Sequence, residues 1–79
     1  MVIQGIVVPC EWDKKGSVTG IAIAGYDEEV TPVLMDINGK KMISLLHKKV
    51  MASGSMVTID NTEFMMINIF DEEKKLQTD

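Results

Sequence analysis

Arginine is absent from this 79-residue chain, and its eight lysines are outnumbered by twelve acidic residues. The net charge is therefore −4. Tight binding to a nucleic-acid backbone depends on clustered lysine and arginine side chains, which meet the phosphates. The charge balance argues against a protein that binds nucleic acid tightly through phosphate contacts.

Cysteine and histidine each occur once, as Cys10 and His47. A lone cysteine excludes an internal disulfide and favours a reducing compartment. The negative charges of Glu11 and Asp13 would raise the pKa of the thiol rather than activate it. We expect His47 to be a surface residue in the middle of a helix. Common zinc, redox and serine-hydrolase motifs are missing, so we expect no enzyme and no cofactor.

Three groups of acidic residues stand out in the chain, and none has the alternating ligand spacing of a calcium-binding loop. The groups are residues 27–29, Asp60 with Glu63, and residues 71–73. Such groups are usually solvated surface, so we expect no metal site.

Long apolar runs are also missing, and none approaches the roughly 18 residues of a membrane-spanning helix. The first residues, 1–5, lack the basic start of a secretory signal. The apolar fraction of 46% and the charged fraction of 25% are those of a globular chain. We therefore expect one domain, cytoplasmic and without a membrane partner, whose four aromatic residues leave methionine, valine and isoleucine to fill the core.

The chain does contain several short apolar segments with the alternation and β-branched residues typical of strands. The pattern predicts strands over residues 2–8, 17–24, 30–35, 56–59 and 64–70. Gly5 and Gly20 mark bends within the first two strands. Pro32 must lie on an edge or at a bulge, because it cannot donate a ladder hydrogen bond. Residues 60–63 have the length of a hairpin connection.

One helix is predicted between the third and fourth strands, over Lys40 to Met51 to within about three residues. An apolar stripe at helical spacing supports it: Met42, Leu45, Leu46 and Val50. Asn38 is suited to cap the start of this helix, and Gly54 is suited to end it.

Three strands, a helix and two further strands resemble the OB-fold (oligonucleotide/oligosaccharide-binding fold). The resemblance is carried by Gly5-Ile6-Val7, Gly16, Gly20, residues 42–50, Gly54 and Val57. It implies a mainly β domain over residues 1–70, a five-stranded OB-like Greek-key barrel with one α-helix between strands 3 and 4. A charged, flexible tail would follow at 71–79. Another small antiparallel barrel, or an α+β sheet with one helix, remains the alternative, and the fold itself hosts many functions.

In OB-fold proteins the ligand surface lies on the second and third strands and on the loops joining strands 1–2 and 4–5. Here the first of these loops presents Trp12 beside Lys14 and Lys15, a ring that could stack a base next to cations that could meet a phosphate. Tyr26 is the nearest further aromatic. Acidic residues in the other loop would repel phosphate. Weak, salt-sensitive binding of single-stranded nucleic acid through these residues is therefore the alternative function.

The segment from Phe64 to Phe70 is uncharged and apolar at both alternating positions. One face would carry Met65, Ile67 and Ile69, and the other Phe64, Met66, Asn68 and Phe70. An apolar second face needs a cover, either from the chain itself or from a partner. We therefore favour a non-enzymatic binding module that engages a protein partner or self-associates. The expected interface residues are Met65, Met66, Ile67, Ile69 and Phe70.

Overall fold

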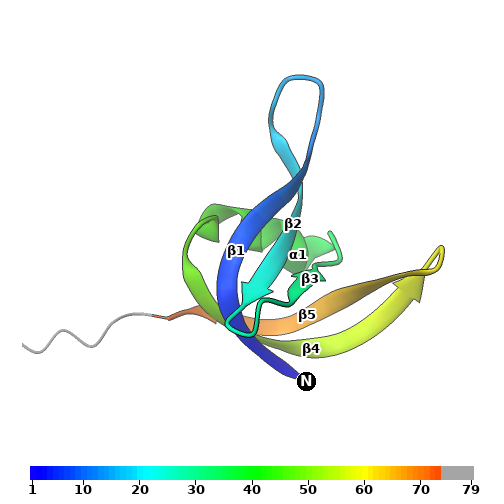
Figure 1. Cartoon of the computed structure of the whole chain (residues 1–79). Helices are drawn as coiled ribbons and strands as arrows, with labels where there is room; N and C mark the ends of the chain where they lie inside the picture. The colour runs from blue at the N-terminus through cyan, green and yellow to red at the C-terminus, as the bar shows by residue number, and fades with distance from the viewer. Residues whose placement is uncertain (74–79) are drawn as a thin grey trace, which may run out of the picture.

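The computed structural model describes residues 1–73 and shows a mainly β chain with one short helical segment (Figure 1). The strands are β1 (Val2–Trp12), β2 (Val18–Gly25), β3 (Val30–Pro32), β4 (Lys49–Ile59) and β5 (Thr62–Glu72). The helical segment consists of α1 (Ile37–Lys41) and the 3-10 turn η1 (Met42–Leu45). As predicted, the helix lies between the third and fourth strands.

All five strands belong to one antiparallel sheet in the order β3-β2-β1-β4-β5. Strand β1 is central: its residues 2–6 pair with β4, and its residues 5–12 pair with β2. Gly5 belongs to both ladders, and a Cβ added there would collide with the carbonyl of Ala24. Glycine is therefore required at the point where β1 passes from one partner strand to the other.

The two ends of the strand order, β3 and β5, lie close together without closing the sheet. Val33, just after β3, forms an isolated parallel bridge with Met65 of β5. The amide of Leu34 donates to the carbonyl of Met65 at 2.9 Å. Pro32 lies in the end strand β3, where its missing N–H is tolerated. The structure thus shows an open five-stranded sheet and not a closed barrel.

The helical segment lies earlier than the predicted helix over Lys40 to Met51. It begins at Ile37 and ends at Leu45, and β4 already starts at Lys49. The residues around Val50 fit a strand as well as a helix, because Val50 and Ala52 alternate with polar or exposed neighbours. These residues adopt the strand conformation because they pair with β1 on one side and with β5 on the other. Gly54 consequently lies inside β4 and does not end a helix.

The start of the helical segment is also capped differently from the prediction. Asp36 provides the cap, and its Oδ1 accepts a hydrogen bond from the amide of Gly39 at 3.0 Å. The side-chain amide of Asn38 instead donates to the carbonyl of Ile67 at 2.8 Å. Asn38 therefore ties the helical segment to β5.

Methionine and branched aliphatic side chains fill the core, as the shortage of aromatic residues predicts. The core cluster consists of Val7, Ile21, Ile23, Val33, Met42, Val50, Ala52, Met65 and Ile67. These residues come from β1, β2, β4 and β5, from the position just after β3 and from η1, so the helical segment packs directly on the sheet.

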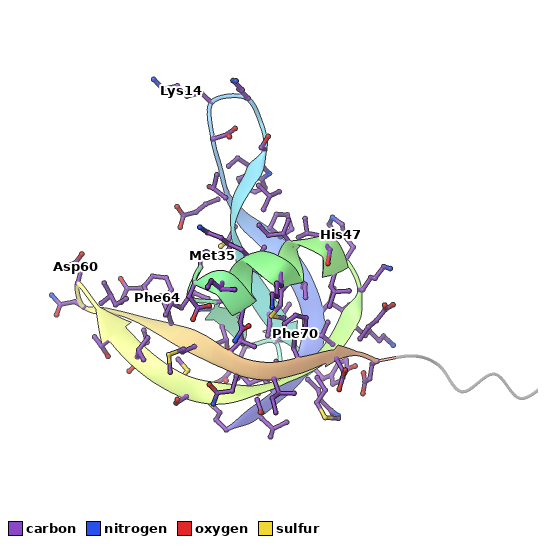
Figure 2. All side chains as sticks on the ribbon, turned by 180° about the vertical axis from the view of Figure 1, so that it is seen from behind. Lys14, Met35, His47, Asp60, Phe64 and Phe70 are labelled. Atoms are coloured by element: carbon purple, nitrogen blue, oxygen red, sulfur yellow. The ribbon has the colours of Figure 1, made fainter. Side chains whose placement is uncertain are left out.

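Strand β5 contains one more residue than the matching part of β4, because the register between them skips Asn68. This bulge reverses the alternation along β5. Ile67 is buried before it, Ile69 is 68% exposed after it, and Phe70 packs against the core beside the helical segment (Figure 2). The prediction that Ile69 shares a face with Ile67, and Phe70 with Met66, was therefore wrong.

The C-terminal end of β5 reaches beyond the predicted boundary at Phe70. The strand continues to Glu72, and the amide of Glu73 donates to the carbonyl of Lys49 at 2.8 Å. Residues 74–79, the rest of the predicted flexible tail, lie outside the described part of the chain.

The burial of η1 gives a test of the corrected helix position. Met42 is fully buried, whereas Leu46, one residue beyond η1, is half-buried. We expect Met42→Ala to lower the free energy of unfolding by about 2–5 kcal/mol. Leu46→Ala should cost only about 1–2 kcal/mol, because less apolar surface returns to water. Urea denaturation of both variants measures the difference, and a larger loss for Leu46→Ala would contradict this packing.

Candidate functional site

Two hairpins project from the sheet in different directions (Figure 1). One joins β1 to β2, and the other joins β4 to β5. In Figure 2, Lys14 marks the tip of the first and Asp60 the tip of the second, with Met35 and Phe64 between them. A groove of about 600 Å³ lies in this region and is lined by residues of both hairpins and of the segment after β3.

The β1–β2 hairpin has a tightly bonded tip. Asp13 and Ser17 are joined by a backbone hydrogen bond of 2.9 Å. The Asp13 carboxylate also accepts from the amides of Lys15 and Ser17, each at 2.9 Å. Gly16 takes the left-handed conformation that completes the turn, with φ of 86°. This geometry places Lys14 and Lys15 at the outermost, exposed positions of the hairpin.

Trp12 precedes this tip and pairs with Val18 at the start of β2. Its side chain is 56% exposed. The structure therefore brings together three of the four predicted ligand residues, Trp12, Lys14 and Lys15, within one short hairpin. Their combination of an exposed ring with two cations is the one that the sequence predicts.

Tyr26 is not part of this group. It follows Gly25 at the other end of β2, roughly 25 Å away, since β2 has eight residues at about 3.3 Å each. Its hydroxyl donates to Oε2 of Glu73 at 3.1 Å. The side chain thus contacts the end of β5 and does not belong to the β1–β2 hairpin.

The β4–β5 hairpin ends in a two-residue turn. Ile59 pairs with Thr62, and the residues between them, Asp60 and Asn61, have φ of 50° and 65°. Positive φ at both positions is typical of the type I′ turn that suits the twist of a hairpin. The predicted tight connection is confirmed, and it holds the tip of this hairpin in a defined place.

The groove between the hairpins has an apolar lining. Its apolar side chains include Pro32, Leu34, Met35, Ile59 and Phe64, and Glu11 is the charged residue of the lining. The sequence predicts strand positions for Met35 and Phe64 but not their common location at the groove. One signal was available: Ile59 and Phe64 flank the hairpin turn, where apolar residues lie far from a core.

The lone cysteine and the lone histidine lie at separate places on the surface. Cys10 is exposed at the groove, where partial burial of the thiol and the charge of Glu11 raise its pKa. A thiol with a raised pKa stays protonated at neutral pH and is a poor nucleophile. His47 is exposed after η1 and not in mid-helix as predicted. Its backbone, with φ of 67°, donates to the carbonyl of Val7 at 2.7 Å.

Two features are absent from the described residues 1–73. No group of three histidine, cysteine, aspartate or glutamate side chains is arranged to hold a metal ion there. Nor does that part of the chain contain a helix long and apolar enough to cross a membrane.

The structure divides the predicted interface residues between the interior and the surface. Met65 and Ile67 are in the core, at 0% and 1% exposure, and Phe70 packs partly against it. Met66 is half-buried, and Ile69 is 68% exposed. Met65 and Ile67 therefore cannot contact a partner while the chain is folded.

The hydrogen bond of Tyr26 gives a direct test of the contact between the β2–β3 turn and β5. The Tyr26 hydroxyl donates to Glu73, and ionisation of the hydroxyl would break this hydrogen bond. The bond therefore raises the pKa of Tyr26. Burial and the negative charge of Glu73 raise the pKa further, by smaller amounts. Tyr26 is the single tyrosine, so ultraviolet absorbance reports its titration alone. We expect a midpoint above the ordinary value of about 10, and a return toward it in Glu73→Gln. Glu29→Gln is the matched control, and equal midpoints in all three proteins would contradict the contact.

Comparisons with known proteins give no family to which the chain can be assigned. No protein-family model matches it, and neither a curated protein nor a solved structure does.

Proposed function

We propose that the chain is a non-enzymatic binding module with an OB-like barrel, which holds an extended apolar segment of a protein partner in the groove between its two hairpins. The strand order supports the barrel, because the end strands β3 and β5 already meet at the Val33–Met65 bridge. Lengthening this parallel contact would close the sheet. The helical segment between β3 and β4 also fits the OB-fold.

The groove is the observation that carries the function. OB-fold proteins bind ligands on the face of the second and third strands, between the loops that join strands 1–2 and 4–5. Here the groove is lined by residues of β2, by Pro32 of β3 and by Ile59 and Thr62, which flank the β4–β5 turn. Ligand sites are usually concave, mostly apolar and furnished with a few polar groups. This groove has that character.

The charges favour a peptide over nucleic acid as the occupant. Glu11 is the charged residue of the lining, and the chain carries a net charge of −4. Lys14 and Lys15 lie at the hairpin tip and not in the groove. The best-suited ligand is therefore an extended peptide with apolar side chains and one basic residue opposite Glu11. A reducing, cytoplasmic setting fits the exposed free thiol of Cys10.

Selection from a displayed library of random peptides tests this proposal. We expect selected peptides to be apolar with one lysine or arginine, and to bind the wild-type chain. Met35→Asp and Phe64→Asp should each weaken binding at least tenfold, because they place a charge among the apolar side chains of the groove. Glu11→Gln should weaken binding less, and mainly at low salt.

The matched control for this selection is Ile69→Asp, which adds the same charge at an exposed apolar residue outside the groove lining. Its binding should equal that of the wild type. Peptides that bind Phe64→Asp and Met35→Asp as tightly as the wild type would place the ligand elsewhere, and a selection that yields no peptide would also refute the proposal.

A second candidate function rests on the β1–β2 hairpin. Trp12 is exposed beside Lys14 and Lys15 on one projecting tip. An exposed aromatic ring can contribute about 1–3 kcal/mol by stacking on a base. Two lysines give little phosphate binding, however, and the acidic chain opposes it. This hairpin supports only weak contact with single-stranded nucleic acid.

The single tryptophan makes the second candidate easy to measure. We expect an oligothymidylate to quench the fluorescence of Trp12 weakly. The logarithm of the binding constant should fall by roughly 1.4 for each tenfold rise in salt concentration, because each of two phosphate contacts contributes about 0.7. Lys14→Ala with Lys15→Ala should remove the salt dependence, while Lys40→Ala with Lys41→Ala should not. Sub-micromolar binding at physiological salt would contradict the weak binding expected from the net charge.

A further inference from the structure

Strand β4 extends beyond its neighbour β1. Residues 49–53 pair with β1, and the amide of Gly54 donates to the carbonyl of Met1 at 3.0 Å. Beyond this point residues 55–59 continue to pair with β5 on one side, while no strand of the described chain pairs with them on the other. Figure 1 shows this part of β4 running out into the hairpin with its outer side free. We call residues 55–59 the β4 edge.

The direction of the backbone groups along the β4 edge follows from Gly54. Its amide points toward the β1 side, and backbone groups alternate sides along a strand. The N–H and C=O groups of Met56 and Thr58 therefore point to the free side, and those of Val57 point to β5. Four backbone groups are thus available to an incoming strand.

The β4 edge lacks the features that keep an edge strand from pairing. Such edges usually carry lysine, proline, an inward charge or a bulge. Residues 55–59 are Ser-Met-Val-Thr-Ile, with no charge and no proline. The register shift between β4 and β5 places its extra residue, Asn68, in β5, so β4 itself keeps its regular alternation.

We propose that two copies of the chain pair through the β4 edge, antiparallel and related by a two-fold axis at Val57. In this register Met56 of each copy is opposite Thr58 of the other, and all four outward backbone groups of each copy are satisfied. A register centred on Met56 would set Thr58 against Gly54, whose amide already donates to Met1. The axis at Val57 therefore gives the most complete pairing.

Charge and exposure favour a second copy as the occupant. Two chains of net charge −4 repel each other over most of their surfaces. The β4 edge is uncharged, so two copies can meet there without placing like charges in contact. Pairing would also cover part of Met56 and Ile59, which are 37% and 45% exposed. Because a contact of five residues per copy falls short of the roughly 1,000 Å² of a stable interface, the dimer is weak and concentration-dependent.

Cysteine cross-linking tests the register. In a Cys10→Ser background, Val57→Cys would place two thiols on a pair that is not hydrogen-bonded, about 4.5 Å apart between Cα atoms. That distance suits a disulfide. Ile59→Cys is the matched control: its two copies would be offset by four residues, about 14 Å. With oxidised glutathione, we expect Val57→Cys to form covalent dimers at least tenfold faster, although Ile59 is well exposed. Equal rates, or no dimer from Val57→Cys, would overturn the proposal.

Light scattering with size exclusion tests the dimer without a cross-link. Thr58→Pro removes an outward N–H but no hydrogen bond to β5, so we expect it to shift the chain to monomer. Ile69→Lys should leave the dimer intact, and so should Met35→Asp, which separates this inference from the groove. A wild-type chain that stays monomeric at high concentration would refute dimer formation through the β4 edge. A dimer that is lost in Ile69→Lys but kept in Thr58→Pro would also refute this pairing. The contact would then lie on the outer face of β5. If Thr58→Pro fails to fold, the cross-linking rates decide.

Discussion

The close contact of backbone at Gly5 is the constraint on which the rest of the structure depends. Strand β1 pairs with β4 through its first residues and with β2 through its later ones, and Gly5 belongs to both ladders. A side chain there would collide with the carbonyl of Ala24. Because β1 changes partner at this point, the β1–β2 and β4–β5 hairpins leave the sheet in different directions (Figure 1). The groove between them is a consequence of this sharing of β1.

The bulge at Asn68 has a similar effect on the distribution of apolar residues. By shifting the alternation along β5, it turns Phe70 toward the core and leaves Ile69 exposed. The carbonyl just before it, that of Ile67, accepts the side-chain amide of Asn38. The bulge thus determines which side chains of β5 are exposed. The carbonyl next to it holds the helical segment through the hydrogen bond from Asn38.

Much of this fold could be predicted from local patterns, because alternation, glycine and turn residues act over a few positions. The number and order of the strands, the edge position of Pro32 and the hairpin turn before Thr62 follow from such patterns. The bounds do not all follow, because β4 begins at Lys49 and not at the predicted residue 56. The helix was placed too late because Val50 satisfies a helical and a strand period equally, and pairing with distant strands made the choice. The bulge and the groove depend on contacts across the sheet. No local pattern contains that information.

The exposed surfaces of this small chain differ in charge from one region to the next. Lysines lie at the tip of the β1–β2 hairpin, acids lie in the β2–β3 turn, and the β4 edge is uncharged. The groove carries one acid among apolar side chains. In a chain with net charge −4, uncharged surfaces of two proteins can approach each other without repulsion, whereas phosphate would be repelled by the excess of acids over lysines. On the functions proposed above, this charge distribution would limit nucleic acid to weak contact and would leave the groove and the β4 edge accessible to protein.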